Sequence, residues 1–207
     1  MRLPARSLLH LFSGVLLWTA ALALFGAEPI AVKPLPDDPA CTPEDRKFMA
    51  RANELAAAAV AHGNTAYGAL LVRDGKVLME FENDAITSGD VTHHAETGII
   101  SVASVKLGLP ALAGATLYTS TEPCIMCCGA ARSAGLKRVV YGVTGTQSHL
   151  LRGRAPLPNP LKIREVFQRL GATDVVINGP LLEAEGLAIH AAALKAPPAA
   201  SAAPSKK

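Results

Sequence analysis

Residues 115–128, ATLYTSTEPCIMCC, place a short strand directly before the start of a helix. Ala115 to Thr119 is predicted to be the strand. Pro123 is a residue type favoured in the first turn of a helix, and this helix should end near Gly135. Another short apolar run follows at 138–141. A strand, a helix and a second strand in succession predict parallel pairing with the helix on one face of a sheet.

The remaining elements extend this pattern in both directions. Upstream, the sequence predicts a helix over 42–62, a hairpin over 67–82 that turns at Asp74-Gly75, a polar loop over 83–90 and a helix over 92–107 capped by Thr92. Downstream, it predicts a helix over 161–170, a strand over 175–177 and a helix over 181–194. The hairpin contributes an antiparallel member. We therefore predict an α/β fold, a three-layer α/β/α sandwich with a five-stranded mixed sheet.

The two ends of the chain have a different composition from the middle. Residues 1–27 carry Arg2 and Arg6 before an uncharged apolar run over 8–27, which is typical of a signal peptide or an N-terminal membrane anchor. A buried core helix would leave the two arginines unexplained. Residues 28–40 are predicted to be a Pro-rich linker, and 195–207 a disordered Ala/Pro/Ser/Lys tail. The folded domain is therefore 41–194, exported to a bacterial periplasm or anchored facing it, with membrane contact only through 8–27.

The predicted domain is electrically neutral. It holds 14 basic and 14 acidic side chains, so the chain's formal charge of +3 arises in the tails. Neutrality disfavours nucleic acid as a partner. The segment 137–169 is nevertheless basic, with Glu165 as its one acid. It is either a solvated surface or a phosphate-binding patch.

Two short motifs carry the chemistry. His94 and Glu96 lie near the start of the helix over 92–107, and Cys124 and Cys127 lie at the start of the helix that Pro123 opens. If both helices follow strands of one direction, their first turns meet at one edge of the sheet. One imidazole and two thiolates make a three-ligand site for Zn²⁺ that leaves a fourth position open for water. Glu96 beside it is placed to shuttle the proton of a water that zinc converts to hydroxide.

His94-Ala95-Glu96 followed by Pro123-Cys124-Ile125-Met126-Cys127 resembles the cytidine and deoxycytidylate deaminase superfamily, in its guanine deaminase or nucleoside deaminase-like branch. The resemblance spans about residues 44–194. It implies the deaminase sandwich, zinc bound by His94, Cys124 and Cys127, and Glu96 as the catalytic proton shuttle. It also implies substrate contacts by Asn83, Ala95 and His93, and a homodimer.

The resemblance favours a guanine-like purine base or nucleoside as substrate. Residues 175–190 resemble the end of nucleoside or guanine deaminase-like proteins, whereas the loop VTGTQSHLLRGRAPLPNP over 143–160 departs from the tRNA-editing branch. Three alternatives stay open: tRNA adenosine deaminase-type editing, an exported Cys-x-x-Cys thiol–disulfide protein, and a catalytically silent deaminase-fold module. Only the deaminase interpretations explain both His94 and Glu96.

Several other side chains have simpler interpretations. Asn83 has a second interpretation as a turn residue after a strand. Cys128 should be a buried packing residue, with a disulfide to Cys41 as an alternative. Met126 is expected in the core. The remaining expectations concern histidines at the surface or at helix ends: His62, His149 and His190.

Overall fold

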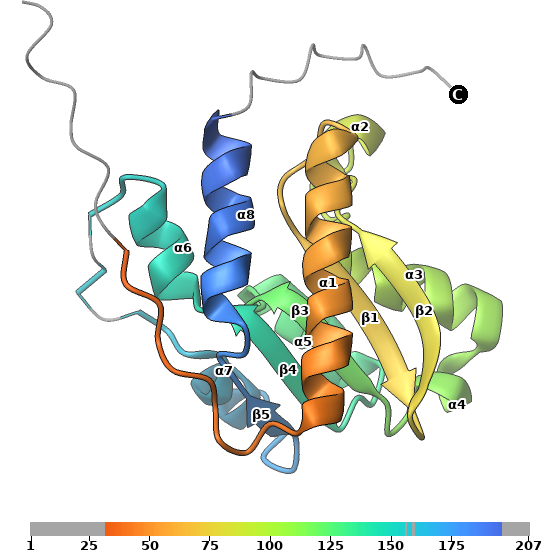
Figure 1. The fold of residues 1–207 in the computed structure, drawn as a ribbon. Coiled ribbons are helices and arrows are strands. Elements are labelled where there is room, and N and C mark those ends of the chain that lie inside the picture. The colour runs from red at the N-terminus through yellow and green to blue at the C-terminus, as the bar shows by residue number, and fades with distance from the viewer. Residues whose placement is uncertain (1–31, 156, 159, 196–207) are drawn as a thin grey trace, which may run out of the picture.

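Five strands form one mixed sheet in the order β2-β1-β3-β4-β5 (Figure 1). Their bounds are β1 Gly68–Arg73, β2 Lys76–Glu82, β3 Thr116–Thr121, β4 Arg138–Val143 and β5 Val176–Asn178. β1 pairs antiparallel with both β2 and β3, while β3, β4 and β5 are parallel. The predicted fold class is confirmed. The computed structural model describes residues 32–155, 157–158 and 160–195.

Helices cover both faces of this sheet and create two apolar cores. One layer is α1 Pro43–Ala61 and α8 Glu183–Lys195; the other is α3 Ala95–Leu107, α5 Ile125–Ser133 and α7 Ile163–Arg169 (Figure 1). Alternation along β1 divides the two cores, because Leu71 faces the α3 layer and Leu70 faces the α1 layer. Each core excludes water from one side of the sheet, which makes the sandwich a single folded unit.

The site helix α3 lies close against β2. A Cβ added at Gly98 would come within 2.3 Å of the Phe81 ring, so only glycine permits this approach. The helix begins at Ala95 with His94 as its N-cap residue. The predicted cap, Thr92, is wrong: its carbonyl instead accepts a hydrogen bond from the Thr97 hydroxyl. The cap of this helix therefore lies two residues later than predicted.

Three short helices lie in segments where the sequence predicted loops. They are α2 Ala85–Ser88, α4 Leu109–Leu112 and α6 Gly145–Leu151. Helices this short have no readable apolar period, so the hydrophobic pattern of the sequence does not predict them. α6 has a local start signal, since the Thr144 hydroxyl accepts a hydrogen bond from the Gln147 N–H.

The segment before α1 lies along the domain surface. Residues 33–38 are part of the predicted linker, yet their backbone is hydrogen-bonded to the domain. The Leu35 N–H donates to Glu183 (2.6 Å), and the Asp38 N–H donates to the Pro180 carbonyl (2.8 Å). The Gln147 amide in α6 donates to the Lys33 carbonyl (3.0 Å). We call residues 33–38 the N-terminal strap.

The cysteines settle one alternative. Cys128 packs in the core under α3 and α5, as predicted, whereas Cys41 packs against the core under α1. The two thiols are free and lie on opposite faces of the sheet, so the Cys41–Cys128 disulfide is excluded in this fold.

None of the described helices combines the length and apolar character that crossing a bilayer requires. The segment 1–27 and the tail after Lys195 lie outside the described residues.

Candidate metal centre and active site

The starts of α3 and α5 meet at one edge of the sheet. β2 and β3 are both antiparallel to β1 and therefore run in the same direction, so the helices that follow them begin at the same edge. His94 is the N-cap residue of α3, Cys124 is the N-cap residue of α5, and Cys127 is in the first turn of α5. Residues 30 positions apart in sequence are brought together by this topology.

The three side chains form a cluster of metal-ligand type, with all donor atoms within 4.8 Å of one another. The Cys124 and Cys127 sulfurs are 3.5 Å apart, and His94 Nδ1 lies 3.7 Å and 3.6 Å from them. Tetrahedral zinc requires about 3.8 Å between two sulfurs and about 3.5 Å between sulfur and imidazole nitrogen. The donor set therefore fits zinc. Among the described residues no further His, Cys, Asp or Glu joins the cluster, which leaves a fourth position for a non-protein ligand.

The two thiols ionise differently. The hydrogen bond from the Cys127 thiol lowers the pKa of Cys124 to about 5, whereas the same bond and burial raise the pKa of Cys127. Metal binding requires both sulfurs as thiolates, so Cys124 is ready to bind at neutral pH, whereas Cys127 would release its proton on binding.

Glu96 lies beside the cluster and below the protein surface. Its side chain is 5% exposed, and Thr119 Oγ1 at the end of β3 lies 3.1 Å from its Oε1. Burial raises the pKa of the Glu96 carboxyl. A carboxyl group held by one neighbour, and next to the cluster, can accept and release a proton there.

A cavity of about 380 Å³ opens over this cluster. Its wall includes His94, Glu96 and Cys124, together with side chains from the connections around β1, β3 and α6: Thr65, Tyr67, Thr121, Glu122, Gly145, Ser148, His149, Arg152 and Arg154. Its volume lies in the range of small-molecule sites. Tyr67 is central to the wall, since its ring lies 6.5 Å from that of His94 and 5.5 Å from that of His190.

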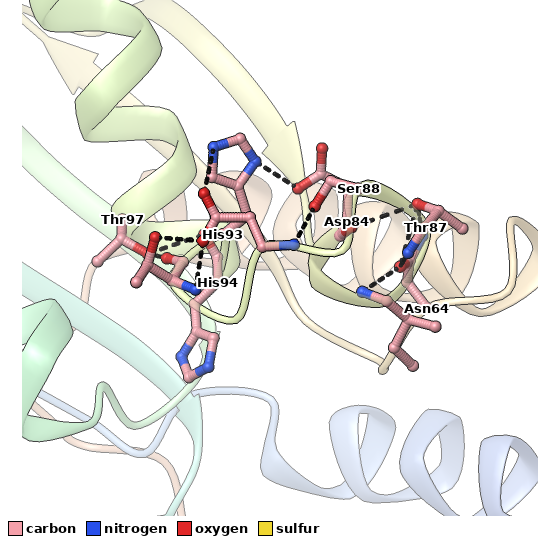
Figure 2. A network of polar contacts seen from close by, with 10 residues as sticks. Asn64, Asp84, Thr87, Ser88, His93, His94 and Thr97 are labelled. Carbon is pink, nitrogen blue, oxygen red and sulfur yellow. Dashed lines mark hydrogen bonds and ion pairs between the residues drawn. The ribbon is translucent and has the colours of Figure 1, made fainter. Parts of the chain in front are cut away.

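The two adjacent histidines have separate environments. Figure 2 shows the His93 ring beside Asp84, whereas the His94 ring points away from it. His93 Nδ1 lies 3.0 Å from Asp84 Oδ1, and its ring stacks edge-on against Phe81. Asn64 accepts the backbone N–H groups of Ile86 and Thr87, which fixes the same loop (Figure 2). His93 thus orders the loop that leads to the ligand.

The other predicted substrate contacts are not among the residues that line this cavity. Asn83 is 1% exposed, its backbone N–H donates to the Tyr67 carbonyl, and its side-chain Nδ2 has no partner among the described residues. Ala95 is fully buried as the first residue of α3, so its N–H has no partner within the helix. Substrate contact by Asn83, Ala95 and His93 stays a prediction.

Sequence reasoning misplaced some residues near the site. His190 was expected at the surface but is 4% exposed, with Nε2 2.9 Å from Thr121 Oγ1. Met126 was expected in the core but is 37% exposed. His149, Arg152 and Arg154 line the cavity. The residue pattern of α8 predicts an apolar face but not what covers it, so it does not predict that His190 is buried. For Arg152 and Arg154, the basic composition of 137–169 is the one sequence feature that pointed to a site.

The sequence matches the family model for the cytidine and deoxycytidylate deaminase zinc-binding region over residues 42–143. With the ligand cluster described above, the chain belongs to this zinc-binding deaminase family, and the predicted family and its cofactor Zn²⁺ are confirmed.

Individual relatives include both guanine deaminases and tRNA-specific adenosine deaminases. The chain is 41% identical over 102 residues to the guanine deaminase of Bacillus subtilis, covering 49% of this chain and 65% of that protein. It is 34% identical over 116 residues to the tRNA-specific adenosine deaminase of Bacillus subtilis, covering 53% of this chain and 72% of that protein. A solved structure of guanine deaminase from Nitrosomonas europaea superposes with a TM-score of 0.62 at 24% identity, covering 74% of this chain and 85% of that chain; this likeness concerns the fold. The chain spans 65%, which is less than two thirds, of the length of the Bacillus subtilis guanine deaminase.

Proposed function

We propose that this protein is a hydrolytic deaminase that replaces the ring amino group of a guanine-like purine base or nucleoside with a carbonyl oxygen and releases ammonia. The observation that carries the proposal is the position of Glu96, a buried carboxyl group held by Thr119 beside a His94–Cys124–Cys127 cluster at the base of a cavity. A silent module or a thiol–disulfide protein would have no use for that carboxyl group.

His94, Cys124 and Cys127 would hold Zn²⁺, which when bound would supply a Lewis acid that makes water nucleophilic at neutral pH. Glu96 takes a proton from the attacking water and passes it to the departing amino nitrogen. The Tyr67 ring forms a wall of the cavity against which a flat heterocycle can stack. Asn83 and the Ala95 N–H are the donors assigned to the substrate.

The guanine-like assignment is supported by the 41% identity to a guanine deaminase and by the neutral charge of residues 41–194. The second candidate, adenosine deamination in tRNA, is supported by 34% identity over 116 residues to one tRNA-specific adenosine deaminase and 44% identity over 75 residues to another. These two candidates share one mechanism and differ only in the substrate, so a single screen separates them.

The test is an ammonia-release assay over guanine, guanosine, adenosine, cytidine and a tRNA anticodon stem-loop. We expect turnover of a guanine compound, and zinc at one equivalent per chain by elemental analysis. Glu96→Gln should retain zinc while kcat falls by roughly 10²- to 10⁴-fold. Exposed Glu185→Gln in α8 is the matched control and should be as active as the wild type. An active Glu96→Gln enzyme would contradict the assigned role.

Export and dimerisation are further proposals. The basic and apolar composition of residues 1–27 supports export through a signal peptide or anchor, and the family resemblance supports a homodimer. N-terminal sequencing of secreted protein and light scattering of purified protein test them in turn.

A further inference from the structure

The basic run over 137–169 is dispersed in the fold, and most of its members have partners. Lys137, Arg138 and Arg169 are each paired with a carboxylate, while Arg164 donates to a backbone carbonyl and Lys162 to a hydroxyl. Of the lysines and arginines in this run, Arg152 and Arg154 are the two that line the cavity over the metal cluster. The sequence-level hypothesis of a phosphate-binding patch therefore reduces to these two side chains.

Arg152 is held in place without losing its charge. The residue follows α6, its guanidinium donates to the Tyr67 hydroxyl at 2.7 Å, and its carbon lies 5.8 Å from the centre of the Tyr67 ring. The side chain is partly buried, and among the described residues neither arginine is within ion-pair distance of a carboxylate. A partly desolvated cation without a counter-ion is costly unless a ligand supplies the negative charge.

The carboxylates of the same cavity are engaged elsewhere. Glu122 accepts the backbone N–H groups of Gly145 (2.8 Å) and Ile163 (3.2 Å), which anchors the start of α6 and of α7. Thr119 Oγ1 lies within hydrogen-bond distance of the Glu96 carboxyl group. The segment after α6 is held as well, because His149 Nε2 lies 2.8 Å from the carbonyl oxygen of Ala155. The arginines thus face the cavity on an ordered segment.

Tyr67 links the two ends of the cavity. One part of this side chain faces the His94 ring, and its hydroxyl contacts Arg152, so a ligand along Tyr67 can reach both the metal cluster and the guanidinium. The hydroxyls of Thr65 and Ser148 also line this wall and add neutral donors. This arrangement suits a ligand with an aromatic ring at one end and an anion at the other.

We propose that Arg152 and Arg154 form an anion subsite for the phosphate of a purine mononucleotide, so that the substrate is a nucleoside monophosphate. This inference rests on the proposed function and makes its substrate class specific. Both arginines follow α6 within 143–160, where the sequence departs from the tRNA-editing branch. We therefore prefer a free nucleotide to an RNA phosphate as the ligand.

The experiment compares guanine, guanosine and guanosine 5′-monophosphate as substrates of the full-length zinc enzyme. We expect kcat/KM for the nucleotide to exceed that for the nucleoside by roughly tenfold to a hundredfold, which is the contribution of a charge-assisted hydrogen bond. Arg152→Gln and Arg154→Gln should each lower this ratio toward one, and added salt should lower it in the wild type. Arg169→Gln, which removes an exposed charge on α7, should leave the ratio unchanged.

Calorimetric binding to the Glu96→Gln enzyme separates this inference from the proposed function. If the Glu96→Gln enzyme binds the nucleotide in a manner that depends on Arg152, but the wild type turns over no purine, the proposed function is overturned and the anion subsite is supported. Turnover of guanine or guanosine with no preference for the nucleotide, or a preference that both arginine variants retain, would overturn the subsite. Turnover of an RNA stem-loop but not of the mononucleotide would overturn the mononucleotide assignment. Arg154 is exposed, so its variant should fold even if Arg152→Gln does not.

Discussion

Thr119 and Glu96 meet where β3 ends beside α3, and their contact is the finest detail on which the proposed chemistry depends. Thr119 is fully buried and its hydroxyl lies 3.1 Å from the carboxyl group. Thr119→Val should lower kcat roughly tenfold with little change in KM, because it removes a positioning hydrogen bond and not a substrate contact. Steady-state kinetics measure kcat and KM separately, and Thr119→Ser should restore activity. Thr116→Val, on the same strand away from the site, is the control; an effect on KM alone would contradict this role.

His190 makes a prediction about pH at the same scale. Burial and, secondarily, the positive charge of Arg152 lower the pKa of His190 to about 4. Because the unfolded side chain protonates near pH 6.5, the unfolded state binds more protons below that pH. Stability is therefore complete above pH 6.5 and is lost as the pH falls toward 4, by about 3 kcal/mol at most. Urea unfolding of wild type and His190→Gln from pH 7 to 4 should show curves that converge on acidification. Exposed His62→Gln should follow the wild type, and parallel curves for His190→Gln would refute the prediction.

At the scale of elements, Glu183 joins three segments that are distant in sequence. This buried carboxylate at the start of α8 accepts the N–H of Leu35 in the N-terminal strap and the N–H of Thr144 (2.8 Å), which precedes α6. Glu183→Gln replaces one acceptor by a donor and leaves a buried N–H unpaired, so the free energy of unfolding should fall by about 1–3 kcal/mol. Urea denaturation measures it. Glu185→Gln on the exposed side of the same helix should change stability by less than about 0.5 kcal/mol.

Local signals determined many element boundaries. Thr42, Pro43 and Asp45 predicted the start of α1, and the capping box is present in the structure. Asp74-Gly75 likewise predicted the hairpin turn. Thr92 misled because a threonine shortly before a helix has the same local appearance as a cap, whereas in the structure His94 is the N-cap residue and Thr92 accepts a hydrogen bond from Thr97.

At the scale of the whole molecule, bound zinc would connect α3 to α5 across the edge of the sheet. Removing it with a chelator should lower the melting temperature, and one equivalent of zinc should restore it. A ligand at a thousandfold excess over its Kd stabilises the folded state by about 4 kcal/mol. Cys127→Ser should lose both the metal and this response, whereas Cys41→Ser, on the opposite face, should keep one zinc per chain. Scanning calorimetry with metal analysis tests this, and a chelator-insensitive melting temperature in the zinc-loaded wild type would contradict it.

The sequence by itself determined the sandwich and the ligand types and predicted the carboxyl group beside them, because spacing along a chain dictates which residues share a turn and which elements alternate. It could not place Tyr67, Glu122 and Arg152 around one cavity, nor separate Cys41 from Cys128 by the thickness of a sheet. Those relations join residues from different layers and loops, and only the packing of the helices on both faces brings such residues together or keeps them apart.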